Sequence, residues 1–140
     1  MTRKLLALLA ALATILGLTV FSPGNASALG GEWLGCRIAP GTEFNFYQYC
    51  NNTKQAYQYS VAFVVQNETA ASTYSWSITA GFGYGISGGC TTTSPSCTLS
   101  VSRGAGDREI DVSVTLTQGG ASNTLYSNAT IMPYCDGNYC

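Results

Sequence analysis

The sequence lacks histidine and has few charged residues. Its 140 residues include 6 Lys and Arg, 7 Asp and Glu and no His. Without histidine, Ser-His-Asp and Cys-His catalysis, His-ligated zinc and haem, and the usual general base at neutral pH are excluded. Binding to nucleic acid needs clustered Lys and Arg, which are absent here. We therefore expect a non-enzymatic protein with no cofactor and no nucleic-acid partner.

Long apolar runs are also lacking, except at the start of the chain. Two basic residues precede an apolar run from Leu5 to Phe21, and a Ser-Pro-Gly break and an Ala-x-Ala site ending at Ala28 follow it. This order is typical of a secretory signal peptide, of bacterial type, cleaved after Ala28. The alternative is a membrane anchor, but the run is near the lower length limit for spanning. We predict a signal peptide at 1–28, a single domain at 29–140, and a secreted protein whose mature chain has no membrane span.

All six cysteines lie in the predicted mature domain. An even number in a small secreted chain predicts disulfides, and the Cys-x-x-Cys spacing that zinc and redox sites use is absent. Cys90 and Cys97 flank a turn-rich loop, so we expect them to bridge a hairpin. The other four either form two local bridges, or the last two pair with the first two. These four are Cys36, Cys50, Cys135 and Cys140.

Apolar and polar residues alternate with a period of two through most of the mature chain. This pattern is typical of strands with one buried face, and no segment has the 3.6-residue period of a helix. Segments rich in Gly, Asn and Ser separate the runs. We predict an all-β fold, a small antiparallel β-sandwich of about seven strands cross-linked by disulfides. The alternating runs are 44–47, 57–65, 74–79, 99–102, 110–117 and 125–131.

The segment from Gln55 to Met132 resembles immunoglobulin-like modules of the polycystic-kidney-disease type and related bacterial modules. Trp76 lies in mid-strand, where such sandwiches have a core Trp on the third strand. Residues 107–117 look like the long sixth strand and 123–131 like the closing strand. The resemblance implies an Ig-like sandwich, a fold that hosts adhesion, carbohydrate binding, inhibition and spacing. The positions of the antibody-type cysteines are occupied by Val61, Phe63, Val112 and Val114.

Tyrosines are the most prominent candidate binding residues. Rigid rings with a polar tip suit sugar stacking or protein contacts, although they also serve to pack edges and anchor loops. Alternation places Tyr57, Tyr59, Tyr74 and Trp76 in the core. The candidates for exposed binding residues are Tyr47, Tyr49, Tyr84, Tyr126, Tyr134 and Tyr139.

Two other patterns have an ordinary structural interpretation beside a functional one. Asp107, Glu109 and Asp111 share one strand face, so they could bind calcium or transfer protons, but we expect a solvated strand face. The glycine-rich stretch 81–89 has no Lys-Ser or Lys-Thr after it, which a phosphate-binding loop requires. We expect a bulged or twisted loop there.

These observations favour a secreted, non-enzymatic Ig-like module that binds an extracellular protein or polysaccharide, or that has a structural role outside the cell. The alternative is a secreted inhibitor of an extracellular hydrolase, since rigid loops lower the entropic cost of binding. Its contact would be the loop 91–96, which has no Lys, Arg or aromatic residue. Inhibition predicts that this loop protrudes, whereas polymer binding predicts a contiguous patch of exposed aromatic residues.

Overall fold

The predicted all-β class is confirmed by a computed structural model, which describes residues 29–42, 44–68 and 72–133. The described residues form eight strands and no helix, one strand more than predicted, so none of them lies in a helix that could cross a membrane. The predicted signal peptide, Tyr134, Cys135, Tyr139 and Cys140 lie outside the described residues. The strands are β1 (Trp33–Ala39), β2 (Tyr49–Asn51), β3 (Gln58–Gln66), β4 (Thr73–Ala80), β5 (Gly85–Gly89), β6 (Ser96–Ser102), β7 (Arg108–Gln118) and β8 (Ala121–Ile131).

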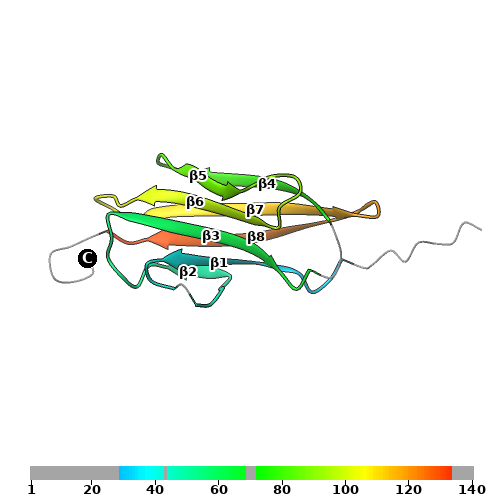
Figure 1. Cartoon of the computed structure of the whole chain (residues 1–140), viewed down its shortest axis with the longest axis horizontal. Helices are drawn as coiled ribbons and strands as arrows, with labels where there is room; N and C mark the ends of the chain where they lie inside the picture. The colour runs from blue at the N-terminus through cyan, green and yellow to red at the C-terminus, as the bar shows by residue number, and fades with distance from the viewer. Residues whose placement is uncertain (1–28, 43, 69–71, 134–140) are drawn as a thin grey trace, which may run out of the picture.

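The strands form two four-stranded sheets, which Figure 1 shows one over the other, with their strands running along the long axis of the molecule. One sheet has the order β1-β3-β6-β5 and the other the order β2-β8-β7-β4. All pairs are antiparallel except β2 and β8, which run parallel, so the expectation of a purely antiparallel fold is wrong in this one place. The short strand β2 covers the edge of β8, whose backbone groups would otherwise lack partners.

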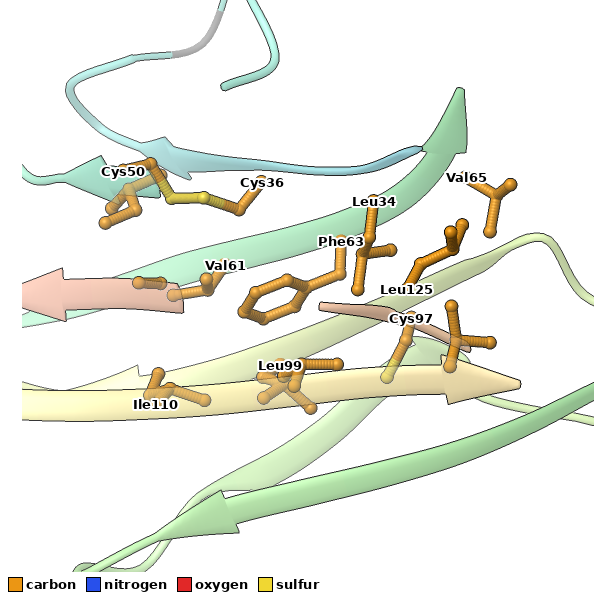
Figure 2. Packing of buried hydrophobic residues seen from close by; sticks show 14 of the residues in the cluster. Leu34, Cys36, Cys50, Val61, Phe63, Val65, Cys97, Leu99, Ile110 and Leu125 are labelled. Carbon is orange, nitrogen blue, oxygen red and sulfur yellow. A yellow bond between two sulfur atoms is a disulfide. The ribbon is translucent and has the colours of Figure 1, made fainter. Parts of the chain in front are cut away.

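The core lies between the sheets and follows the predicted alternation. Every second residue of β3 is buried, and the same holds for β6 and for most of β7 and β8. Figure 2 shows Phe63 of β3 in the middle of this cluster, with Leu34 and Leu99 around it. Burial of these side chains is the main source of stability. The largest fully buried side chains are Phe63, Leu34, Ile38, Leu99, Ile110, Leu116 and Ile131.

One predicted core position is wrong. Tyr57 is 77% exposed because it precedes the first residue of β3 and lies beyond the end of the sandwich. The guanidinium of Arg103 stacks over the ring of Tyr57, and its central carbon lies 3.9 Å from the ring centre. Trp76 faces the core but is only half-buried, and its indole N–H donates to the carbonyl of Ser94. Tyr59 and Tyr74 are buried as predicted.

The run 44–47 is not a strand, so that prediction is also wrong. It belongs to the connection that carries the chain from β1 in one sheet to β2 in the other. Only Tyr47 pairs there, in an isolated bridge with Cys36, and Phe44 is 93% exposed. A connection between layers has no sheet on which to bury an alternating face.

The glycine-rich stretch combines a loop with a strand. Residues 85–89 form β5, an edge strand whose pairing with β6 shifts in register between Ile86 and Gly88. The expected irregularity is present, but within a strand rather than within a loop. All five residues of β5 are exposed, so this strand adds little to the core.

The predicted bridge between Cys90 and Cys97 forms, and Cys36 follows the local one of the two alternatives. Cys90 pairs with Cys97 across the turn between β5 and β6. Cys36 of β1 pairs with Cys50 of β2 and therefore connects the two sheets, as Figure 2 shows.

Candidate functional site

The outer face of the β2-β8-β7-β4 sheet gathers polar and aromatic side chains from four strands. We call this surface the outer face. The register places Tyr49, Asn128, Asp111 and Thr79 in one row across the four strands. The next row holds Tyr126, Ser113 and Ser77. Side chains of one parity point to the same side of a sheet, which explains why strands with apolar inner residues carry this polar outer row.

Tyr49 and Tyr126 are the two large aromatic side chains of the outer face. They are 71% and 67% exposed, respectively. Both line an open hollow of about 260 Å³. Its other lining residues are Ser77, Thr79, Asp111, Val112, Ser113, Ser127 and Asn128. Hydroxyl, amide and carboxylate groups thus lie between two rings, which is an arrangement suited to binding and orienting a polar ligand.

A second hollow, of about 340 Å³, adjoins the first. Tyr49 and Asn128 line both hollows, so the tyrosine stands between them. The remaining lining residues of the second hollow are Cys50, Asn51, Thr130 and Met132. The two hollows therefore lie next to one another along β2 and β8 and share Tyr49 and Asn128.

An amide connects two carboxylates on this face. The side-chain N–H₂ of Asn128 donates to Asp111 at 2.9 Å and to Glu109 at 3.2 Å. This contact aligns the three side chains and fixes the orientation of the Asn128 amide. Glu109 and Asp111 are exposed, as expected for a solvated strand face. Among the described residues, no group of three potential metal ligands comes together.

The position of Tyr49 depends on contacts of its neighbours in the chain. Cys50 forms the disulfide to Cys36. On the other side of Tyr49, the carbonyl of Gln48 accepts hydrogen bonds from the Ser127 hydroxyl at 2.8 Å and from the Asn128 backbone N–H. A strand of three residues is too short to hold its place by pairing alone. These cross-links fix it instead.

Asn52 anchors the other end of β2. It is 2% exposed, and its side-chain oxygen accepts a hydrogen bond from the Met132 backbone N–H at 2.7 Å. Its side-chain N–H₂ donates to the Tyr59 hydroxyl and to the carbonyl of Lys54. A buried amide whose polar groups all have partners holds the adjoining backbone in one position.

Paired hydroxyls continue the outer face beyond the hollows. The hydroxyls of Thr115 and Thr124 lie 2.9 Å apart, and those of Thr117 and Ser122 lie 3.0 Å apart. These cross-strand pairs connect β7 and β8 toward their hairpin turn. The hydroxyl rows extend the polar character of the outer face.

The structure brings together two of the six candidate tyrosines. Tyr47 is 47% exposed and Tyr84 is 37% exposed, but neither lines the two hollows. Tyr134 and Tyr139 lie outside the described residues. The sequence analysis did not place Tyr126 beside Asn128 and Asp111. The alternation in residues 110–117 and 125–131 does put all three on the polar side of their strands. Nothing in the sequence distinguishes Asn52 and Ser127 from the many other polar residues, so their buried roles could not be predicted.

The loop 91–96 is folded back onto the sandwich. The carbonyl of Pro95 accepts a hydrogen bond from the Val65 N–H at 2.9 Å, and that of Thr92 accepts one from the Tyr74 N–H at 3.0 Å. Ser94 accepts the indole N–H of Trp76. Three backbone carbonyls of this loop therefore accept hydrogen bonds from β3 and β4.

Comparison with known proteins adds no family or relative. No protein-family model matches this sequence, and no curated protein matches it. The functional argument rests on the residues of the outer face.

Proposed function

We propose that this chain is a secreted, non-enzymatic Ig-like module that binds an extracellular polysaccharide on its outer face. The observation that carries the proposal is the pair of exposed rings, Tyr49 and Tyr126, at one polar hollow. Sugars have an apolar ring face and a polar edge. Aromatic rings bind the first, while hydroxyls, amides and carboxylates bind the second.

The polar groups of the hollow are suited to a sugar edge. Ser77, Thr79 and Ser113 can donate and accept hydrogen bonds, and Asp111 can accept them. The Asn128 amide is already oriented by its two carboxylate partners and by the Thr130 hydroxyl, which donates to its oxygen at 3.3 Å. That oxygen has a second lone pair that can accept a hydrogen bond from a ligand. Preorganised groups of this kind lower the entropic cost of binding.

The Ig-like assignment is supported by the strand order. Immunoglobulin-type sandwiches place the first, second, fifth and fourth strands in one sheet and the third, sixth and seventh in the other. The order β1-β3-β6-β5 corresponds to the first set, and β8-β7-β4 to the second. β2 then corresponds to the second half of a divided first strand. Trp76 lies on β4, which is the third strand in this scheme.

Secretion is supported by two features. The first 28 residues have the order of a signal peptide, and the two disulfides are consistent with an oxidising, extracellular environment. The inhibitor alternative receives no such support, because the backbone of the loop 91–96 is bonded to β3 and β4 rather than protruding.

The test is co-sedimentation of the oxidised protein with insoluble chitin, deacetylated chitin, cellulose, starch and peptidoglycan. We expect the protein to pellet with at least one polymer. Tyr49→Ala and Tyr126→Ala should each weaken binding about tenfold or more, because stacking rings at binding hot spots contribute at least about 1.4 kcal/mol. Tyr57→Ala is the matched control, since it removes a similarly exposed ring that precedes β3 and lies outside both hollows.

Two results would contradict the proposal. One is the absence of pelleting with every polymer. The other is equal loss of binding in the Tyr57→Ala control and in the two outer-face variants, which would indicate that the outer face is not the binding surface.

A further inference from the structure

The shape of the outer face restricts the length of the ligand. The residues of the first hollow come from four neighbouring strands, which together span about 14 Å, or three strand spacings of about 4.8 Å. The second hollow extends this surface beside β2. A single sugar ring would leave one hollow empty, whereas a chain of rings would contact Tyr49 from both sides.

The charges on the outer face restrict the chemistry of the ligand. Asp111 lines the first hollow, and Glu109 lies beside it on the same strand face. Among the described residues, no Lys or Arg lines either hollow. The three arginines of the described residues stack over Phe46, Tyr57 and Phe82 and line neither hollow. The face is therefore complementary to a positive charge and unfavourable for a carboxylate or sulfate.

We infer that the ligand is a linear polysaccharide of amino sugars that carries free, protonated amino groups and that crosses both hollows. The inference rests on the proposed function and specifies its substrate class. An ammonium group has three donors and a positive charge, and it pairs with the carboxylates of Asp111 and Glu109. The neighbouring sugar rings of the polysaccharide stack on the side chains of Tyr49 and Tyr126.

Asn128 positions the carboxylates for this contact. Its amide N–H₂ binds one oxygen of Asp111 and one of Glu109. Each carboxylate retains a second oxygen for which the described residues supply no cation. Because the amide joins both side chains, the two negative charges lie near one another and act together on a ligand amine. The nitrogen of an N-acetylated sugar is uncharged and therefore gains no such attraction to the carboxylates.

The test is a titration of the oxidised protein with soluble hexamers and dimers of glucosamine, N-acetylglucosamine and galacturonate, followed by NMR or calorimetry. The titration is made at about pH 5.5, at which the sugar amines are protonated. We expect the glucosamine hexamer to bind about fivefold or more tightly than the N-acetylated hexamer. The preference should shrink at about 0.5 M salt, because mobile ions screen exposed charges. Hexamers should bind more tightly than dimers, and galacturonate should bind most weakly.

Two variants with the same chemical change separate the site from the general charge of the protein. Asp111→Asn should abolish the preference for the amine while retaining binding of the N-acetylated hexamer. Asp107→Asn removes one charge from the loop before β7, outside both hollows, and should leave the preference unchanged.

The outcomes distinguish this inference from the proposed function. Equal binding of both hexamers, with both still dependent on Tyr49 and Tyr126, would overturn the inference and leave polysaccharide binding intact. Equal affinity for dimers and hexamers would overturn the claim that the ligand crosses both hollows. If none of these oligosaccharides shifts a resonance of the outer face, the inference fails, and the co-sedimentation panel with cellulose and starch then decides the proposed function.

Discussion

The phenol of Tyr74 is a buried titratable group in an acidic setting. Its side chain is 5% exposed, and its hydroxyl donates a hydrogen bond to Glu68. Burial raises the pKa of Tyr74 above its ordinary value of 10.0, and the hydrogen bond and negative charge of Glu68 raise it further. The folded protein therefore keeps this proton at a pH at which the unfolded chain releases it.

This shift in pKa predicts a loss of stability in alkaline solution. Above about pH 10 the unfolded chain binds fewer protons than the folded protein, so the free energy of unfolding falls as pH rises. The Tyr74 contribution is at most about 1.4 kcal/mol per pH unit for one proton, and it is absent below that range. Denaturant unfolding between about pH 9 and 11 should show this decline. Tyr74→Phe has no proton to lose and should reduce it, and an identical slope in both proteins would contradict the assignment.

The end of β5 depends on one glycine. Gly89 has a positive φ of 67°, and a Cβ added there would lie 2.0 Å from the backbone carbonyl oxygen of Ser96. That carbonyl accepts the Cys90 N–H, so it is held by the turn and cannot easily move away. The hairpin that carries the disulfide between Cys90 and Cys97 therefore requires glycine at this position.

Gly89→Ala should lower the free energy of unfolding by at least about 2 kcal/mol, because strain from the left-handed conformation and the contact with Ser96 add together. The measurement is denaturant unfolding of the oxidised protein. Gly88→Ala is a matched control, because a Cβ at Gly88 meets no atom within 4 Å and its φ is not positive. It should change stability by no more than about 0.5 kcal/mol. Similar losses in both variants would contradict the role of Gly89.

The elements that the sequence predicts well are those whose burial has a strict period of two. β3, β7 and β8 bury every second side chain, and their alternation is visible without a structure. β1 was missed because its outer residue Gly35 is buried as well, under Phe46 and Trp33, so its pattern is not a simple alternation. β2 has three residues, too few for a period to appear.

The candidate site could be predicted only in part, because local alternation shows which side of a strand a residue faces but not which strands pair. Parity within β8 places Tyr126 and Asn128 on the solvent side, and parity within β7 does the same for Asp111. Their meeting depends on the pairing of β7 with β8 and on the parallel pairing of β2, which joins Tyr49 to the face. Register and sheet order arise from long-range contacts, which local alternation does not specify.

At the scale of the whole molecule, the two disulfides have different roles. Cys36–Cys50 connects the two sheets and lies next to Tyr49, whereas Cys90–Cys97 closes a hairpin within one sheet. Cys97 is fully buried in the core, so its strand is held by packing as well as by the bridge. β2 has only three residues to pair. Loss of the Cys36–Cys50 bridge should therefore loosen β2 and with it the outer face. Loss of the Cys90–Cys97 bridge should leave the outer face unchanged.

Removing each disulfide in turn separates stability from binding. Cys36→Ala/Cys50→Ala should lower the free energy of unfolding by about 3 kcal/mol, and Cys90→Ala/Cys97→Ala by about 2.5 kcal/mol, from the loss of loop constraint in the unfolded chain. Unfolding in denaturant measures both effects. Only the first variant should also weaken polymer co-sedimentation, because Tyr49 then loses the bridge that holds its neighbour Cys50. If both folded variants bind as well as the parent protein, the bridge does not position Tyr49, and the hydrogen bonds of Gln48 and Asn52 to β8 suffice.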